Sequence, residues 1–559
     1  MDNKNVFIAI ALSMSVLLFW AAFFESPKPI NSNATQTQKK TNENIITPNI
    51  NESLKVEAIS REDSLKMSER IKIENDSVIG SMSLEGGLID DISFKKHKQN
   101  LENNLNVEFL NPPQTEDGFY VETGWTSIVN KIKVPTKKSI WIVNGNKVLG
   151  KNEPIVLEWN NEEGIIFKKR IELDNKYLFK ITQEVQNNTN QAIDLYPYAQ
   201  ITRNRIPDYI QNFYISHEGF IGVFDEELKE DDYDDIEENK IVREANEGWL
   251  GITDKYWMAA LVPKKGENFK STFLYKDSFK ANYILNNPTR INPSSNNSNE
   301  VRLFVAAKEV DTIDSYAADQ SINKFDLVLD WGWFYFFTKP LFFIIDYLFK
   351  YFGNFGTAIV LITVGIRLIF FPLANYSFRS MAKMKAVQPE MTRLKELHKE
   401  DKTKLQQEMM ALYRKEKINP ASGCLPVLIQ IPFFFAIYKM LFISLEMRHQ
   451  PFFGWIKDLS DKDPTSLFNL FGLIPWDPPS FLIIGIWPIL MGASMWVQQK
   501  LNPAPADPMQ AKIFAFFPLF LTIILASFPS GLVVYWTINN ILTIAQQWVI
   551  MKQTKVKTN

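Results

Sequence analysis

Five apolar runs in the C-terminal part of the chain restrict the fold more than any other feature of the sequence. They lie at about 357–378, 424–445, 480–499, 511–528 and 532–551, and none of them contains Asp or Glu. A helix needs about 20 mostly apolar residues to cross the roughly 30 Å hydrocarbon layer of a bilayer. Because each run is close to that length, the sequence predicts an α-helical membrane core of five spans over 357–551.

A sixth apolar run, uncharged, occupies residues 6–24. It is longer than the apolar core of a typical signal peptide, and the ESPKP stretch that follows is a poor cleavage site. We therefore interpret residues 1–25 as a retained signal-anchor span, with a cleaved signal peptide as the alternative. Residues 26–55 are rich in Asn, Thr, Gln, Pro and Lys, a composition typical of a disordered tether.

Residues 56–325 change to short runs in which apolar and polar residues alternate. Asn144-Gly145 stands between two such runs and predicts a β-hairpin, and Asp174-Asn175 marks a second turn of this kind. The pattern predicts a large all-β domain, a β-sandwich, on the outer side of the membrane. An acidic run at 225–240 is predicted to be a solvated loop, with a binding role left open.

The segment 326–356 includes the strongly aromatic stretch 331–356, which contains three charged residues, Lys339, Asp346 and Lys350. Charges at these positions disfavour a span, so we expect an amphipathic helix in the membrane interface.

Lys and Arg residues set the expected orientation. The loop at 379–418 contains eleven Lys or Arg against six Asp or Glu, and the short tail at 552–559 is basic, whereas 446–479 is acidic. The positive-inside rule then puts 379–418 and the tail in the cytoplasm. With the N-terminal span included, six spans put both termini in the cytoplasm and the β-sandwich outside it, in the periplasm.

The loop at 379–418 is itself predicted to be a helical hairpin that turns at HKED, 398–401, and stops before Asn419-Pro420. A solvated, charged helix pair is one interpretation. Capture of apolar segments by a Met-rich face is the other. The apolar residues assigned to this capture hairpin are Met384, Met391, Leu394, Leu405, Met409 and Leu412.

Arg367 lies in the middle of the first C-terminal run. A charge at the bilayer centre costs at least about 2.5–3.5 kcal/mol and normally pairs or faces water. Because the five runs contain no carboxylate, we expect a hydrophilic groove that admits water, with simple interhelical hydrogen bonding as the alternative for the polar stripe. The residues assigned to the groove are Arg367, Thr363, Gln430, Asn539, Asn540, Thr543 and Gln546.

Two further polar residues receive structural interpretations. Lys439 is expected to extend toward the outer interface, within reach of Glu446. Cys424, the single cysteine, is expected to pack as a small apolar residue. The four histidines lack metal-ligand spacing, and no nucleotide-binding or nucleophile motif occurs. The sequence therefore predicts no metal, no cofactor and no enzyme chemistry.

Four motifs appear in order at 365–373, 419–441, 507–513 and 528–550. They are GIRLIFFPL, NPASGCLPVLIQIPFFFAIYKML, DPMQAKI and FPSGLVVYWTINNILTIAQQWVI. They resemble the signature segments of the YidC family of membrane protein insertases, the Oxa group. The anchor and the large β domain are similar to the Gram-negative form of that family.

This resemblance implies a function and a set of site residues. The chain would insert and help fold nascent membrane proteins in the inner membrane, through a hydrated groove open to the cytoplasm, alone or with the Sec translocon. The groove arginine falls on Arg367 and its neighbour on Thr363. The substrate-contact slide falls on Ile362, Phe434 and the pair Tyr535-Trp536, where many members have tyrosine at the last position.

The resemblance also implies partners: nascent membrane proteins, the Sec translocon with its accessory subunits, the translating ribosome and membrane lipids, without a nucleotide. The short tail at 552–559 argues against tail-mediated ribosome binding. Two other functions remain open at this point. A secondary transporter would use a polar midplane site, although the five spans show no internal repeat. The other is a membrane-anchored periplasmic domain that binds carbohydrate or acts as an enzyme; an enzyme would need a catalytic constellation, which 56–325 does not show.

Overall fold

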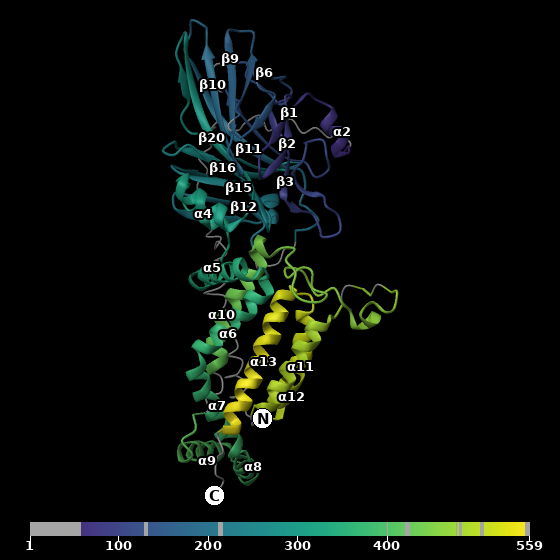
Figure 1. The fold of residues 1–559 in the computed structure, drawn as a ribbon. Helices are drawn as coiled ribbons and strands as arrows, with labels where there is room; N and C mark the ends of the chain where they lie inside the picture. The colour runs from purple at the N-terminus through teal and green to yellow at the C-terminus, as the bar shows by residue number, and fades with distance from the viewer. Residues whose placement is uncertain are drawn as a thin grey trace. The chain divides into compact units, whose positions relative to one another are not determined.

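A computed structural model of the chain describes residues 58–127, 132–151, 153–210, 216–399, 401–419, 425–476, 478–479, 483–502 and 508–553. The predicted anchor span, the tether and Cys424 lie outside these residues, as does most of the short tail. The described chain consists of a β-rich region followed by C-terminal helices, drawn with their labels in Figure 1.

Strands β1 to β20 form two sheets. The 11-stranded sheet has the order β14-β17-β18-β11-β5-β3-β2-β1-β7, with β19 paired to β11 and β4 to β3. The 9-stranded sheet has the order β13-β12-β15-β16-β20-β10-β9-β8-β6. The first sheet contains β1 (Arg70–Glu74), β2 (Val78–Ser83), β3 (Leu88–Lys98), β4 (Asn106–Leu110), β5 (Phe119–Thr126), β7 (Val148–Gly150), β11 (Ile193–Arg203), β14 (Ile241–Ala245), β17 (Phe269–Tyr275), β18 (Phe279–Leu285) and β19 (Thr289–Ile291). The second contains β6 (Ile142–Asn144), β8 (Ile155–Asn160), β9 (Ile165–Leu173), β10 (Leu178–Asn187), β12 (Gly219–Phe224), β13 (Glu227–Asp231), β15 (Gly248–Thr253), β16 (Trp257–Pro263) and β20 (Ser295–Ala307).

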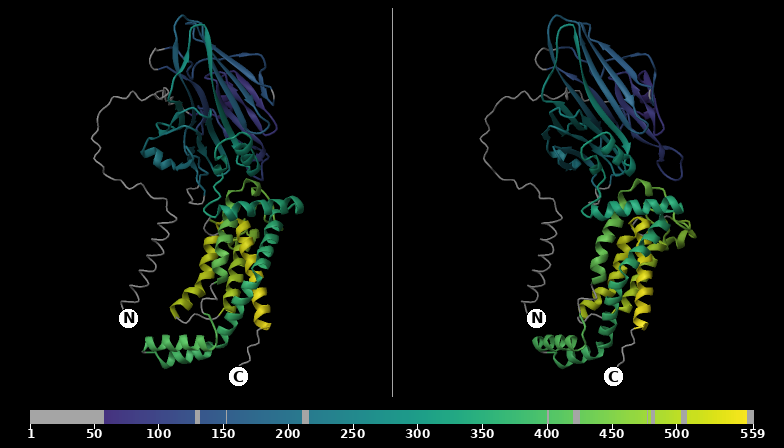
Figure 2. Two further views of the ribbon diagram at one scale, coloured as in Figure 1. Left: turned by 90° about the vertical axis from the view of Figure 1, so that its left-hand side faces the viewer. Right: turned by 60° about the vertical axis from the view of Figure 1, so that its left-hand side comes forward.

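The two sheets pack face to face around one apolar core. Aromatic rings from the two sheets meet there, since Phe94 of β3 stacks on Trp257 of β16 with ring centroids 5.1 Å apart. Phe220 of β12 likewise contacts Phe273 of β17 at 5.0 Å. Figure 2 shows the strands from two further sides. The large β-rich domain that period-two alternation predicts is therefore present.

The two predicted turns have different outcomes. The turn at Asp174-Asn175 joins β9 to β10, which pair antiparallel, so this hairpin is confirmed. The hairpin at Asn144-Gly145 is wrong, because β6 pairs with β8 while β7 pairs with β1 of the other sheet. Gly145 has φ +102°, which glycine adopts readily. The dipeptide marks a true turn, but this turn moves the chain between sheets.

The acidic run at 225–240 is not the solvated loop that its charge predicts. It forms β13 and a short helix, α3 (Tyr233–Glu238), whose Tyr233 and Ile236 are buried. Asp231 is paired with Arg243, with Nη1 2.7 Å from Oδ2. Two apolar side chains and one ion pair therefore fix a segment that composition alone marks as exposed.

Helices dominate the chain after β20. The helical segments outside the sheets are α2 (Arg61–Lys66), α4 (Val310–Asp319), η1 (Phe325–Val328), α5 (Tyr335–Phe352), α6 (Phe355–Ile369), α7 (Phe371–Ala386), α8 (Gln388–Leu397), α9 (Lys402–Lys415), α10 (Leu425–Ile443), η3 (Leu445–Met447), η4 (Leu467–Gly472), α11 (Ile486–Leu501), α12 (Pro508–Leu525) and α13 (Ser530–Gln553). Helix α5 is the expected amphipathic helix, and it ends at Gly353, whose φ of +69° suits a helix C-terminus.

The first predicted run, 357–378, is not one straight helix. Helices α6 and α7 meet at Phe370 with a bend of 68°. Pro372 stands in the first turn of α7 and has no N–H to donate to the Leu368 carbonyl, so an unbroken helix is unfavourable here. Among the described residues no single helix is both long and apolar enough to cross a membrane, whereas α6 and α7 together meet that criterion across their bend.

Helix α13 lies at the centre of the helical region, where it packs against α6, α7, α10 and α11 (Figure 1). Helix α12 packs on α11. A Cβ at Gly492 of α11 would lie 2.0 Å from Thr522 Oγ1, so this glycine permits the close approach of these two helices. In the described part of the run predicted at 480–499, helix α11 begins at Ile486.

The helical hairpin is shorter than predicted. Helix α7 continues to Ala386, so residues 379–386, including Met384, belong to α7. Helices α8 and α9 form the hairpin, and α8 ends at Leu397 and α9 begins at Lys402, on either side of the predicted turn. Leu394 is buried and the hydroxyl of Tyr413 lies 4.0 Å from the sulfur of Met391. Met391, Leu405, Met409 and Leu412 are half-buried.

Candidate polar site around Arg367

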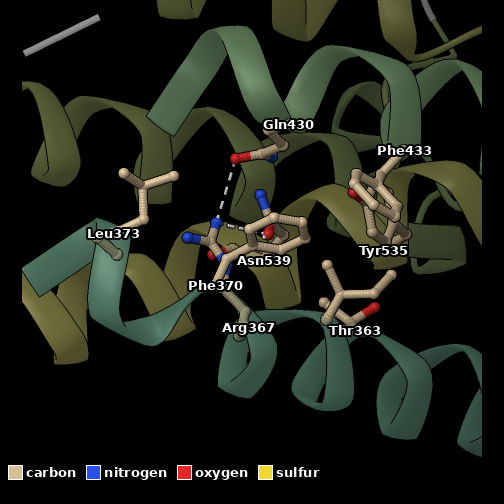
Figure 3. Close-up of a pocket in the computed structure, with 10 residues that line it drawn as sticks. Thr363, Arg367, Phe370, Leu373, Gln430, Phe433, Tyr535 and Asn539 are labelled. Atoms are coloured by element: carbon tan, nitrogen blue, oxygen red, sulfur yellow. Dashed lines mark hydrogen bonds between the residues drawn. The ribbon is translucent and has the colours of Figure 1, made fainter. Parts of the chain in front are cut away.

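Arg367 projects from α6, one turn before the bend, toward α10 and α13. Its Nε donates to Asn539 Oδ1 at 2.9 Å, and Nη2 donates to the same oxygen at 2.5 Å. Nη2 also lies 2.5 Å from Thr543 Oγ1 and 3.2 Å from Gln430 Oε1. Figure 3 shows the guanidinium pointing at the Gln430 and Asn539 side chains. Four of the residues assigned to the groove therefore meet at one point.

The partners of this guanidinium are all neutral. Amide and hydroxyl oxygens satisfy N–H donors but leave the positive charge uncompensated, unlike a carboxylate. Interhelical hydrogen bonds, the alternative interpretation of the polar stripe, thus hold Arg367 in place. These bonds connect α6 to α10 and α13. The charge itself still calls for water or an anionic group nearby.

A small cavity adjoins the guanidinium. It has a volume of about 50 Å³, which is room for roughly three to five waters at about 10–15 Å³ each. The side chains that line it are Thr363, Ile366, Arg367, Phe370, Leu373, Ala374, Gln430, Phe433, Tyr535 and Asn539. The wall of the cavity is mostly apolar, whereas the sequence predicts a hydrophilic groove.

Thr363 lies one turn before Arg367 and is 2 % exposed. Its hydroxyl donates to the Ile359 carbonyl at 2.6 Å, so only its lone pairs can serve a group in the cavity. Thr543 has the same arrangement, because its hydroxyl donates to the Asn539 carbonyl at 2.6 Å and accepts from Arg367. Both threonines therefore act as acceptors at this site.

The polar stripe predicted on the last run divides between two neighbouring helices. Asn539 and Thr543 face Arg367, whereas Asn540 donates to Ser494 Oγ of α11 at 3.0 Å. Gln547, beside the stripe, donates to Asn502 Oδ1 at 3.1 Å. Gln546 does not line the cavity, and its Nε2 is buried without a hydrogen-bond acceptor among the described residues. Asn540 and Gln546 are thus not part of the Arg367 cluster.

The residues assigned to the slide lie close to the cavity. Phe434 of α10 meets Trp536 of α13 edge to face, with ring centroids 4.8 Å apart. Tyr535 is buried and lines the cavity, with its ring centroid 6.5 Å from that of Phe434. Ile362, Phe434 and Trp536 are half-buried. Sequence reasoning missed Phe370 and Phe433, although Phe370 follows Arg367 at the i+3 spacing that puts two residues on one helix face.

Lys439 is paired differently from the expectation. Its Nζ lies 2.5 Å from Asp330 Oδ2, in the segment before α5. Glu446 instead accepts a hydrogen bond from the Val310 backbone N–H at 2.8 Å. The predicted reach between Lys439 and Glu446 is therefore wrong, since each has a partner from the segment that precedes α5.

Two family models match the chain. "YidC periplasmic domain" matches residues 70–344 and "60Kd inner membrane protein" matches residues 347–558. The membrane protein insertase YidC of Pelagibacter ubique (strain HTCC1062) is 52% identical over 559 residues, with all of both chains covered. The chain belongs to the YidC family of membrane protein insertases. The YidC of Brucella melitensis biotype 1 is 41% identical over 590 residues, covering 100% of this chain and 97% of that one.

Solved structures also resemble the chain. A crystal structure of an active YidC insertase with its first transmembrane domain resolved has a TM-score of 0.35 and 16% identity, covering 86% of this chain and 92% of that one. A galactose mutarotase related enzyme from Lactobacillus acidophilus has a TM-score of 0.30 and 12% identity, covering 43% of this chain and 97% of that one.

Family membership confirms the resemblance that the motifs indicate. This YidC family member is a membrane protein insertase of the bacterial inner membrane, and its β-rich region is the periplasmic domain. The alternatives of a secondary transporter and of an anchored enzyme have no support in the family, which is one of insertases.

Proposed function

We propose that the chain moves the polar flank of a nascent membrane protein through a recess built around Arg367. The proposal rests on a difference among the three nitrogens of the Arg367 guanidinium in their hydrogen bonds to the described residues. Its Nε and Nη2 are held by Asn539, Thr543 and Gln430, while Nη1 makes no hydrogen bond with any described residue. One nitrogen of a fixed, uncompensated cation is thereby available to water or to a substrate acceptor.

Electrostatics makes an acidic flank the favoured occupant. The neutral partners leave the charge of Arg367 in place, and apolar walls strengthen its attraction for a carboxylate relative to bulk water. Passage through a hydrated recess reduces the desolvation cost of a polar segment in the bilayer. A membrane potential adds about 2.3 kcal/mol per charge per 100 mV for an acidic flank that moves outward.

Apolar contact then guides the hydrophobic segment into lipid. In this proposal the segment passes Ile362, Phe434 and Trp536, and its burial supplies about 25 cal/mol per Å². Capture precedes that step at the α8–α9 hairpin. Most of its assigned side chains are half-buried, so the exposed Leu397 and Met410 are the better candidates for first contact, at 64% and 45% exposure.

The membrane arrangement belongs to the same proposal. We place the bent α6–α7 pair, α10, α11, α12 and α13 across the membrane and α5 in its outer interface. With the N-terminal anchor, both termini and the α8–α9 hairpin would be cytoplasmic, as the basic loop indicates. The Sec translocon with its accessory subunits, the translating ribosome and lipids are proposed partners, with no cofactor or nucleotide required.

Cysteine accessibility tests the hydrated recess. Thr363→Cys, in a chain whose Cys424 is replaced by Ser, should react with a membrane-impermeant charged thiol reagent added from the cytoplasmic side. Thr537→Cys is the matched control, because Thr537 is 1 % exposed, donates to the Val533 carbonyl at 2.8 Å and does not line the cavity. Equal protection of the two cysteines would contradict the recess.

Depletion of the protein tests insertion itself. Newly made small membrane proteins should become accessible to protease in altered patterns when the chain is depleted, and recover on re-expression. Insertion that is normal after depletion would contradict the function in this cell. If depletion impaired insertion but Thr363→Cys did not react with the reagent, the insertase function would stand and only the hydrated recess would be contradicted.

A further inference from the structure

The outward face of the 11-stranded sheet is polar and yet buried. Val121, Ile201 and Ala281 point into the sandwich core, so their chain neighbours point to the opposite face. On that face Lys280 of β18 pairs with Thr202 of β11, which pairs with Tyr120 of β5. Asp90 of β3 continues the row, because Ile89 pairs with Val121. An outward sheet face is usually polar and exposed, but these four side chains are 1–6 % exposed.

A cleft of about 500 Å³ lies over this row. Tyr120, Lys280 and Asp90 line its wall, together with Arg70 and Lys137 from neighbouring segments. Sites for small molecules have volumes of about 300–1,000 Å³ and contain a few convergent polar groups. The cleft has the size and the polar wall of such a site, and it is remote in the sequence from the Arg367 cluster.

Three charged side chains of the cleft wall, Arg70, Asp90 and Lys137, are held in ion pairs. Arg70 forms a two-nitrogen ion pair with Asp90, in which Nη1 lies 3.4 Å from Oδ2. Lys137 Nζ lies 3.2 Å from Glu122 Oε2 and also donates to the Tyr120 hydroxyl at 3.4 Å. These pairs fix the wall before any ligand arrives.

Lys280 differs from them. It is 5 % exposed and makes no hydrogen bond or ion pair with any residue that the structure describes. A buried ammonium without a partner is costly. Burial, reinforced by the charge of Lys137, holds the pKa of Lys280 below its usual range. The charges that act on Lys280 are the ammonium groups of Lys137 and Lys276 and the carboxylates of Glu122 and Asp277. With the charge of Lys280 itself, this end of the cleft has one positive charge in excess.

We propose that this cleft binds an acidic sugar, whose carboxylate lies against Lys280 and Lys137. The Asp90 carboxylate accepts hydrogen bonds from ligand hydroxyls, and Tyr120 supplies a further hydroxyl to them. Tyr275, 43 % exposed at the cleft, offers a ring face to the apolar side of the sugar. The positive end favours an anion over a neutral sugar, and the row of hydroxyl, carboxylate and ammonium groups favours a polyol over a simple acid.

The test uses the full chain in detergent and ligand-observed NMR titration. The probe is D-glucuronate. D-glucose is the control that has the sugar hydroxyls but no charge, and acetate is the control that has the carboxylate but no hydroxyls. We expect saturable binding of glucuronate at least tenfold tighter than that of glucose or acetate. Binding of all three with similar strength would overturn the proposal, as would an Asp/Glu-containing tripeptide that binds more tightly than glucuronate.

Variants locate the binding in the cleft. Lys280→Met should weaken glucuronate binding at least tenfold, and Lys280→Arg should retain most of it. Lys265→Met is the control, since the side chain of Lys265 is 76% exposed and does not line the cleft. Tyr275→Ala, which removes a partly exposed ring whose centroid lies 4.6 Å from that of Phe279, should weaken binding severalfold. Wild-type affinity in both Lys280→Met and Tyr275→Ala would overturn the assignment.

Discussion

Arg367 and Asn539 are joined by two hydrogen bonds to one oxygen, from Nε at 2.9 Å and from Nη2 at 2.5 Å. They connect α6 to α13 across 172 positions of sequence. Because Asn539 is an amide, the contact orients the guanidinium without neutralising it. Orientation and charge are therefore separable at this site by substitution.

Asn539→Asp separates them directly. A carboxylate keeps or strengthens the contact to Arg367 and cancels its positive potential. We expect insertion of substrates with acidic flanks to fall about tenfold, equivalent to about 1.4 kcal/mol, while substrates with neutral flanks change much less. Protease protection of paired acidic and neutral substrates measures the difference. Asn539→Gln, which keeps a neutral amide, is the control, and equal losses for both substrate classes in Asn539→Asp would contradict the electrostatic role.

Arg367 itself gives the complementary test. Arg367→Ala should impair substrates with acidic flanks, because the charge is removed. Arg367→Lys keeps the charge as a point donor but loses the planar arrangement of two nitrogens on Asn539, so it should retain most insertion if charge alone matters. The same paired-substrate protection assay measures both variants. Normal insertion of acidic-flanked substrates by Arg367→Ala would count against the proposal.

Sequence reasoning identified the cluster but not its internal contacts. A lone charge in an apolar run is visible without a structure, and so are the polar residues that share helical spacing with it. Whether Asn539 or Asn540 faces α6 depends on the rotation of α13 about its axis. That rotation is set by packing against both α6 and α11, so one part of the polar stripe contacts α6 and another part contacts α11.

Local signals likewise predicted turns better than partners. Asn144-Gly145 correctly marks a turn, but the choice of β8 and β1 as partners is made by contacts distant in sequence. The bend between α6 and α7 was missed for a different reason. Hydropathy does not register Pro372, whose missing N–H and ring decide the geometry of the backbone. The acidic segment 225–240 shows how two apolar side chains override composition.

Pro372→Ala should straighten the α6–α7 junction. With the N–H restored, α6 can continue through Phe370, and the 68° bend should decrease. Spin labels at Leu361 and Lys383, both exposed, should move apart by about 5 Å on complete straightening, from a rise of about 1.5 Å per residue. Pulsed dipolar spectroscopy measures this distance in a Cys424→Ser chain. Pro518→Ala, in the interior of α12, is the control and should leave the distance unchanged.

Lys169 carries a stability prediction for the periplasmic domain. Its side chain lies between the sheets, 2 % exposed, where Nζ donates to the Thr123 carbonyl at 2.6 Å and lies 4.7 Å from the Trp141 ring centroid. Burial, opposed only in part by the charge of Glu122, lowers the pKa of Lys169 to about 8. At pH 7 the folded state therefore holds a buried charge at a cost in free energy.

Lys169→Met removes that cost. We expect the free energy of unfolding at pH 7 to rise by about 2 kcal/mol, since a buried charge is lost at the expense of one hydrogen bond. In the parent chain the unfolded state binds more protons than the folded state between pH 8 and about 10.5, so the stability contribution of Lys169 increases with pH across that window. The advantage of Lys169→Met should accordingly shrink when unfolding is followed at pH 10 instead of pH 7. Lys168→Met is the control, since Lys168 lies on the opposite face of β9 with a partly exposed side chain; it should change the free energy of unfolding by less than about 0.5 kcal/mol at either pH. If Lys169→Met stabilised the protein equally at pH 7 and pH 10, the buried ammonium of Lys169 would not be the source of the lost stability.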